Sequence, residues 1–278
     1  MNIAIVGLGL MGGSLAMALR GFRGCAIFGT DRDGLVVREA LERGIVDEGW
    51  ADARQAIVRA DMTVFCIPPQ GVLEGFREYA GCFRSGSVVT EICGVKGRVC
   101  KAAEALPAGV QYAGIHPMAG KEHSGIGNAD GALFQGTGFL ITPIASTEDK
   151  TVTLLEEMAR YIGAARVVVS PAAQHDEIIA YSSDLMHAAA FGLCMERPDG
   201  FTMAHTAGAF RDCTRVAQSD PTLWAELFIE NAQALLPQLD GLAGNLAAMG
   251  DAIRQGDKGG LEALLRAANR NKKEMQTR

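Results

Sequence analysis

The sequence of 278 residues predicts an α/β domain over residues 1–170, followed by an all-α domain over residues 171–278. Two observations support this division. Short apolar runs alternate with helical stretches as far as Ser170-Pro171, and no strand-like alternation follows. Strands that alternate with helices form a mostly parallel sheet with helices on both faces, whose ligands bind at the carboxyl ends of the strands.

The first apolar run is followed by a glycine-rich turn. Residues 3–6 form the predicted strand, Gly7-x-Gly9-x-x-Gly12 follows it, and a helix is predicted from Ser14 to Arg20. In this motif the glycines permit a tight turn, backbone approach to a pyrophosphate, and close packing of helix on strand. Unpaired N–H groups at the helix start then face the pyrophosphate. The pattern indicates a Rossmann-type dinucleotide-binding domain, in which we expect the cofactor to contact Gly7, Gly9, Leu10, Met11 and Gly12.

The second predicted strand, residues 26–29, determines the expected cofactor. Asp31 follows it, roughly 20 residues after the last glycine, where a carboxylate accepts hydrogen bonds from the adenosine ribose. Because a carboxylate repels a 2′-phosphate, Asp31 favours NAD over NADP. Arg32 weakens that preference, since a basic residue at this point sometimes accommodates the phosphate. The alternative is that Asp31 is an ordinary helix N-cap.

The alternation then continues in order. Helices are predicted over 34–43, 70–82, 97–105 and 148–162, and strands over 62–67, 87–91, 111–115, 138–142 and 165–169. Several predicted strand ends carry groups that would meet in one cleft. Beside the glycine turn, we expect cofactor contacts from Pro68, Gln70, Cys93 and Gly94.

His116 follows the strand over 111–115. Pro117 lacks an N–H and restrains the preceding residue to extended geometry, so His116 closes a strand and is not helical. A histidine that ends a strand is more often structural than catalytic. In a fold that brings a nicotinamide to the strand ends, however, it is placed to accept a proton while a hydride leaves. We therefore identify His116 as the candidate catalytic base.

The all-α part is predicted to contain helices over 172–195, 202–218, 221–249 and 257–275. Apolar residues lie on more than one face, which predicts packing against a partner chain. Ser183 and His187 share one helical face. Trp224 suits either the core or the wall of a substrate site. The charged side chains of the helix over 202–218 suit either a solvated network or a ligand; they are Arg211, Asp212 and Arg215.

Composition restricts the class of protein. Thirty-two acidic against 26 basic residues give a net charge of −6, which argues against nucleic-acid binding. No apolar run approaches the length that spans a bilayer, and the N-terminus enters the first strand without a signal peptide. The seven cysteines show no metal-ligand spacing, so we expect no metal site. We expect a reducing compartment, the cytoplasm.

Five segments together resemble the prephenate dehydrogenase family, which includes arogenate and cyclohexadienyl dehydrogenases of tyrosine biosynthesis. They are GLGLMGGS over 7–14, TEICGVKG over 90–97, HPMAGKEHSG over 116–125, HDEIIAYSSDLMH over 175–187 and FRDCTRVAQSDPTLW over 210–224. The set in this order is specific and covers almost the whole chain. The resemblance implies NAD-dependent oxidative decarboxylation of prephenate to 4-hydroxyphenylpyruvate, CO2 and NADH by a homodimer.

The resemblance also implies roles for single residues. His116 matches the histidine that takes the proton of the ring hydroxyl, and Arg215 the arginine that holds the ring carboxylate. His187 matches a second substrate-side histidine, and Glu122 an acidic residue that helps close the pocket. The remaining pocket-lining positions are Lys121, Arg211, Asp212 and Trp224.

Two positions depart from the family pattern. The family commonly has a serine at Gly94, which bonds both the catalytic histidine and the substrate hydroxyl, so here a water or Cys93 would have to replace it. Asp184 and Met186 stand where the family usually has histidine and proline. A carboxylate at 184 could raise the pKa of a neighbouring histidine or alter substrate choice.

Three other functions are compatible with parts of the sequence. Arogenate, or both substrates, is the nearest alternative; the positive charges of Lys121 and Arg211, together with His187, favour the keto acid prephenate over an amine. A non-catalytic NAD-binding sensor is suggested by Gly94 alone. Hydroxyacid or pyrroline reductases share the domain plan but lack the HPMAG loop combined with the FRDxTR helix.

Overall fold

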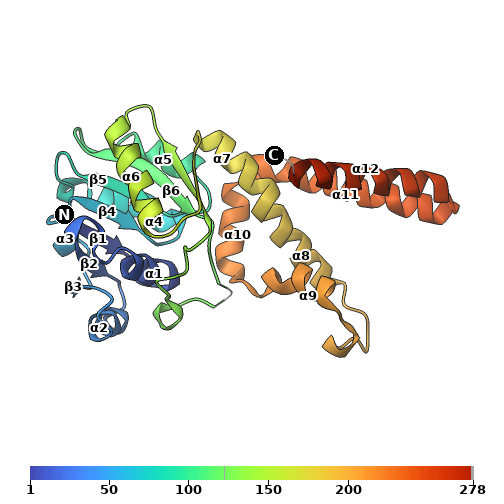
Figure 1. Ribbon diagram of the computed structural model, residues 1–278, viewed down its shortest axis with the longest axis horizontal. Helices are drawn as coiled ribbons and strands as arrows, with labels where there is room; N and C mark the ends of the chain where they lie inside the picture. Colours follow the sequence, from blue (N-terminus) through green and yellow to red (C-terminus); the bar gives the residue numbers. More distant parts are fainter. Residues whose placement is uncertain (122, 277–278) are drawn as a thin grey trace. The chain divides into compact units, whose positions relative to one another are not determined.

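The computed structural model describes residues 1–121 and 123–276, and the chain forms two compact units. The first, Met1–Asn231, contains the sheet and all helices up to α10 (Pro221–Glu230). The second, from Ala232 onward, is formed by α11 (Ala232–Gln255) and α12 (Lys258–Gln276), which pack against each other (Figure 1). The unit that holds the sheet thus extends past residue 170, the boundary that the sequence predicts.

The predicted α/β fold with a mostly parallel sheet is confirmed. Within the described residues the sheet has eight strands in the order β3-β2-β1-β4-β5-β6-β7-β8. β1 to β6 are parallel, β7 is antiparallel to β6, and β8 is parallel to β7. The strands are β1 (Asn2–Val6), β2 (Ala26–Thr30), β3 (Glu48–Trp50), β4 (Met62–Phe65), β5 (Val88–Glu91), β6 (Gln111–Pro117), β7 (Gly138–Pro143) and β8 (Arg166–Val169).

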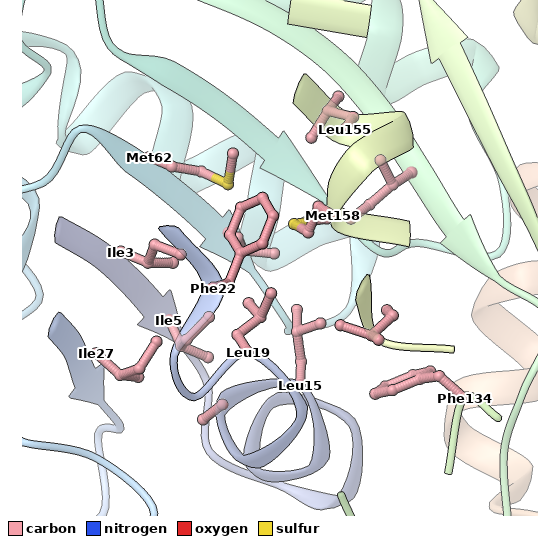
Figure 2. Packing of buried hydrophobic residues seen from close by; sticks show 14 of the residues in the cluster. Ile3, Ile5, Leu15, Leu19, Phe22, Ile27, Met62, Phe134, Leu155 and Met158 are labelled. Atoms are coloured by element: carbon pink, nitrogen blue, oxygen red, sulfur yellow. The ribbon is translucent and has the colours of Figure 1, made fainter. Parts of the chain in front are cut away.

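Alternating residues of the central strands bury the two faces of the sheet. Ile3 and Ile5 of β1 face the cluster that includes α1 (Leu10–Ala18), α2 (Gly34–Glu42) and α6 (Asp149–Tyr161), part of which Figure 2 shows. Val6 faces the opposite cluster, formed with α3 (Arg54–Ile57), α4 (Pro69–Glu78) and α5 (Gly97–Ala103). The two cores fix the strand ends, and therefore the cleft, as one rigid edge.

Two element boundaries near that edge differ from the prediction. α1 begins at Leu10, and not at Ser14, because the extended Gly9 directly precedes the first helical turn. Leu10, Met11 and Gly12 therefore belong to the helix start. β6 continues to Pro117, because this segment pairs with the reversed strand β7, His116 opposite Leu140. His116 accordingly lies in a strand, one residue before its end.

A long helical segment follows β8. It comprises α7 (Ala172–Ile179), one π-helical turn (Ala180–Asp184) and α8 (Leu185–Met195). The helix predicted over 202–218 is instead α9 (Gly208–Thr214) between two 3₁₀ turns, Met203–His205 and Arg215–Gln218. The helix predicted over 221–249 is divided at Asn231 into α10 and α11.

The segment Ala172–Met195 corrects one expectation from the sequence. Its 24 helical residues reach a mean hydropathy of 1.3 over an 18-residue window, which is long and apolar enough to cross a membrane. The expectation that no apolar stretch approaches that length is therefore wrong for this segment. The segment also buries the polar side chains of His175 and Asp184, whose partners lie in the first unit. Those contacts attach the first half of the segment to the rest of the first unit, although only 28% of the apolar window is buried.

Candidate active site

The glycine turn has the geometry that a dinucleotide requires. Gly7 has a φ of +94°, in the left-handed region that favours glycine. A Cβ at Gly12 would lie 1.8 Å from the carbonyl oxygen of Gly7, whereas a Cβ at Gly9 would meet no atom within 4 Å. Helix α1 therefore packs directly on the turn, and the backbone at Gly9 is open to a ligand. These residues fit a pyrophosphate at the start of α1.

Asp31 lies at the end of β2 and holds the glycine turn. Its Oδ2 accepts a hydrogen bond from the backbone N–H of Leu8 at 2.9 Å, and its Oδ1 accepts one from Asp33 at 3.0 Å. The N-cap of α2 is Asp33, whose side chain accepts from the backbone of Leu35. Asp31 is thus not the helix cap that the alternative proposed. Its carboxylate oxygens retain lone pairs for a ribose.

Replacement of Asp31 by serine is expected to lower the ratio of kcat/KM for NAD to kcat/KM for NADP by roughly tenfold or more. The variant loses the charge-assisted hydrogen bond to the ribose of NAD, and it no longer repels the 2′-phosphate of NADP. Steady-state kinetics with both cofactors would measure this ratio. Asp33→Ser is the matched control, since Asp33 caps α2 and should change stability only. Equal losses with both cofactors would reduce Asp31 to a structural role.

His116 is hydrogen-bonded to a second histidine that the sequence analysis did not identify. Its Nδ1 lies 3.0 Å from Nε2 of His175, and Nδ1 of His175 lies 2.8 Å from Oδ1 of Asp176. His175 is fully buried. Both new residues come from the start of α7. Two signals for them were present in the sequence: a histidine stands next to an acid just after the last strand, and this pair begins the segment over 175–187 that resembles the family.

Asp176 fixes α7 to the loop that follows β5. Its Oδ1 accepts from the backbone N–H of Lys96 and its Oδ2 from that of Gly97, both at 2.8 Å, at the start of α5. Its own backbone carbonyl accepts from Nδ2 of Asn231 at 3.0 Å. The two backbone N–H groups therefore hold the carboxylate, Asn231 holds the backbone of the same residue, and the orientation of the carboxylate toward His175 is fixed.

A buried ion pair lies beneath His116. Nζ of Lys96 donates to both carboxylate oxygens of Glu91, at 2.8 and 2.9 Å, and to the carbonyl of Ile115 at 2.6 Å. Glu91 also accepts from the backbone N–H of Cys93 at 2.6 Å and the hydroxyl of Tyr112 at 3.0 Å. Because neither charge is exposed, the pair must keep all of these partners. It locks the end of β5 to the residue before His116.

His116 is neutral near pH 7. Burial, with smaller contributions from His175 and Lys96, holds the pKa of His116 well below its ordinary value. Among the residues that the structure describes, Nε2 of His116 has no hydrogen-bond partner, and Nδ1 is occupied by His175. The free nitrogen can therefore accept a proton from a ligand.

The position of the missing serine has space for a side chain. A Cβ at Gly94 would lie 3.5 Å from the side chain of Leu227 and 4.0 Å from Cε1 of His116, which is ordinary contact. Cys93 does not replace the serine, because its thiol lies 3.8 Å from the carbonyl of Ile67 and burial raises its pKa well above the ordinary value. His116 nevertheless has a hydrogen-bond partner on its other side, where Nδ1 contacts Nε2 of His175.

Helix α10 brings the substrate-side candidates to this loop. Leu227 contacts the position of Gly94, and Glu226 accepts from the backbone N–H of Gln70 at 2.9 Å, at the start of α4. On the same helix Trp224 stacks on His187, with ring centroids 3.4 Å apart. Nδ1 of His187 donates to the carbonyl of Ser183 at 3.0 Å, and burial lowers the pKa of His187. Its Nε2 is thereby left as an acceptor.

The other predicted substrate residues have different surroundings. Arg215 begins the 3₁₀ turn that packs against α8, and Arg211 and Asp212 lie exposed on α9. Lys121 is paired with Asp130 at 3.1 Å. The substrate roles of these residues and the cofactor roles of Arg32, Pro68 and Gln70 stay predictions, and Glu122 lies outside the described residues.

The sequence suggested that the carboxylate of Asp184 could raise the pKa of a neighbouring histidine, but its contacts in the structure are different. Asp184 is 2% exposed, and its Oδ2 accepts from Nδ2 of Asn231 at 2.7 Å. Burial raises the pKa of Asp184 to about 6. Its carboxylate thus affects the interior of the helical part and not the ionisation of His187.

Replacement of Asp184 by asparagine is expected to stabilise the protein at pH 7.5 by about 1–3 kcal/mol, because a pKa unit is worth about 1.4 kcal/mol. The folded-state pKa is raised, so the wild type loses stability as pH rises through about 6. The amide keeps the hydrogen bond to Asn231 without a charge. Urea unfolding should show the difference at pH 7.5 and its disappearance near pH 4; an equal difference at both pH values would contradict this origin.

Comparison with known proteins gives a consistent result. Two family models match the chain, the prephenate dehydrogenase nucleotide-binding domain over residues 15–169 and the prephenate dehydrogenase dimerization domain over residues 171–267. The cyclohexadienyl dehydrogenase of Zymomonas mobilis is 30% identical over 264 residues, which are 92% of this chain and 89% of that protein.

Two solved structures resemble the whole chain. The prephenate dehydrogenase of A. aeolicus, in complex with hydroxyphenyl propionate and NAD+, has a TM-score of 0.87 at 27% identity, covering 99% of this chain and 98% of that one. The arogenate dehydrogenase of Synechocystis has a TM-score of 0.82 at 28% identity, covering 99% and 100%.

Proposed function

The chain belongs to the prephenate dehydrogenase family and is an NAD-dependent oxidoreductase, and we propose that it converts prephenate to 4-hydroxyphenylpyruvate and CO2 in tyrosine biosynthesis. One observation carries the assignment. His116 stands at the strand edge with Nδ1 engaged by His175 and Nε2 open, beside a loop that contacts α10. This is the arrangement of a general base for a hydroxyl.

The reaction requires little beyond a base and a cation. Prephenate is a cyclohexadienol with a hydroxyl at C4 and a carboxylate at C1. NAD, when bound, supplies the hydride acceptor for the C4 hydrogen. Nε2 of His116 takes the hydroxyl proton, and the electrons of the C1–carboxylate bond move into the ring as CO2 leaves. His116 then returns its proton to the ring oxygen, so the product is a neutral phenol and no proton is lost.

Arg215 is proposed to hold the C1 carboxylate until it leaves. The planar guanidinium binds a carboxylate through two parallel hydrogen bonds, which position the ring over the hydride acceptor. Because aromatisation supplies the driving force, the protein acts mainly by orientation. His187 and Trp224, which are stacked on each other, would form the wall at the side-chain end of the substrate.

Prephenate is favoured over arogenate by charge. Arg211, on the helix that precedes Arg215, would attract a keto acid side chain and repel an ammonium group. Asp212 next to it keeps arogenate as the second candidate. We therefore expect kcat/KM to be highest for prephenate with NAD in a steady-state comparison of both substrates with NAD and NADP. A higher kcat/KM for arogenate would make arogenate the substrate. If neither substrate gave NADH, the proposed function would be overturned.

We also propose a homodimer formed through the helical part, with the domain boundary at residue 170. The match to a dimerization domain supports oligomerisation. Helix α8 exposes large apolar side chains, Met186 at 52% and Leu193 at 49%, as expected of a surface that a second copy covers. Light scattering of the protein in solution should give twice the mass of one chain if the homodimer forms.

We also propose a cytoplasmic location. The seven free cysteines fit this reducing compartment.

A further inference from the structure

We infer that His175 and Asp176 are positioning residues that fix the tautomer of His116 and stabilise its protonated form. The inference rests on the proposed function, because it assigns how the base of that reaction is prepared. It depends on two contacts in series, Asp176 Oδ1 to His175 Nδ1 at 2.8 Å and His175 Nε2 to His116 Nδ1 at 3.0 Å, and on the open Nε2 of His116 at their end.

The direction of the hydrogen bonds follows from the Asp176 end. A carboxylate only accepts, so Nδ1 of His175 must carry a proton. Neutral His175 then has an unprotonated Nε2, which accepts from Nδ1–H of His116. The remaining nitrogen of His116, Nε2, is left with its lone pair. The series therefore selects the one neutral tautomer of His116 that can take a proton from the substrate.

The series is rigid because its far end is anchored by backbone. The N–H groups of Lys96 and Gly97 donate to the two oxygens of Asp176, and neither donor can become an acceptor. His175 is fully buried, so its ring has no water partner to exchange for His116. The other charged groups at the site, Lys96 and Glu91, neutralise each other. Asp176 thus supplies the uncompensated negative charge nearest to the two histidines.

The same contacts act when His116 receives the proton. The imidazolium then still donates from Nδ1 to His175, and the dipole of His175 points to the carboxylate of Asp176. Burial alone would oppose the protonated form of His116, so this support matters during turnover. Gly94 provides no side chain that could share the task, and His175 is the hydrogen-bond partner of His116 within the described residues.

Asp176→Asn is the sharpest test, because it keeps the shape, removes the negative charge and replaces one of the two acceptor oxygens with a donor. When its amide nitrogen faces His175, it forces the opposite tautomer on both rings and blocks Nε2 of His116. We expect kcat to fall on the order of 10²-fold, with KM for prephenate within about threefold of wild type, as a misplaced proton on a general base requires. Asp52→Asn is the matched control, since Asp52 accepts from the backbone of Arg54 at 3.0 Å and contacts no histidine.

Two variants at His175 separate hydrogen bonding from packing. His175→Gln can still accept from His116 through its amide oxygen and should retain more activity than His175→Leu, which cannot. Thermal unfolding of all variants checks that they fold. Should His175→Leu fail to fold, Asp176→Asn and His175→Gln still decide the matter. Equal kcat in folded wild type, His175→Gln and Asp176→Asn would overturn the inference.

The second readout does not need turnover. Nitrogen-15 NMR of the imidazole rings, with the His116 signal assigned by its absence in His116→Asn, should show the Nδ1–H tautomer in wild type and its loss in Asp176→Asn. An Nε2–H tautomer in wild type would overturn the inference whatever the activity. The Nδ1–H tautomer in a wild type that oxidises no cyclohexadienyl substrate would instead overturn the proposed function alone.

Discussion

Replacement of His116 by asparagine is expected to lower kcat by ~10²–10⁴-fold and to leave KM for prephenate nearly unchanged. The amide of asparagine can still donate to Nε2 of His175, so the contact with α7 survives and only the proton acceptor is lost. Steady-state kinetics would measure both parameters. A variant with near-full activity would remove His116 from the role of base.

The pH profile gives an independent check on the same residue. Activity requires unprotonated His116, so kcat/KM of the wild type, which reports the free enzyme, should fall as pH decreases through the pKa of His116. Because burial lowers that pKa well below 6.5, the fall should begin only at pH values clearly below 6.5. The residual activity of His116→Asn should lack this acid limb. A wild-type decline centred above 6.5 would assign the limb to another group.

Replacement of Arg215 by glutamine is expected to raise KM for prephenate roughly ten- to hundredfold while KM for NAD stays unchanged. The loss corresponds to a charge-assisted hydrogen bond of about 1.5–3 kcal/mol. Arg215→Lys should recover little, because a point charge does not reproduce the planar fork that binds a carboxylate through two bonds. Steady-state kinetics of both variants would test the clamp.

Because Arg215 is exposed, the expected change in KM for prephenate needs a control. If Arg215 belonged only to a solvated network on this surface, both variants would behave like wild type, since exposed ion pairs contribute ~0–1 kcal/mol. Arg254→Gln is the matched control, an exposed arginine paired with Asp251 in the second unit, and it should leave both KM values unchanged. An unchanged KM for prephenate in the Arg215 variants would contradict the clamp.

Most of the fold could be predicted because its signals are local. Apolar runs, the glycine turn and Asp220-Pro221, which starts α10, each lie within a few consecutive residues. The elements that differ from the prediction lie where tertiary contacts determine the secondary structure. β3 has three residues, too few to show an alternation, and it exists because it pairs with the edge of β2. The extension of β6 to Pro117 depends on its pairing with β7. No local sequence pattern indicates that β7 runs antiparallel to β6.

The candidate site divides in the same way. His116 could be proposed because the strand end and Pro117 lie next to it in sequence. His175 approaches it only because α7 returns to the sheet edge, 59 residues later. Glu91 and Lys96 carry charges that would be assigned to the surface, and only the packed structure shows that they are buried together. Spatial neighbours that are distant in sequence leave no periodic signal in one chain.

The π turn at Ala180–Asp184 makes the length of the helical segment, and not only its composition, a requirement of the site. In a continuous α-helix, Asp176 and His187 would lie within about 20° of each other around the axis. A π turn accommodates one extra residue, which rotates the following half by roughly 100°. The first half can therefore face His116 while the second faces Trp224. Deletion of a single residue here would turn one of these two faces away, although no functional side chain had been changed.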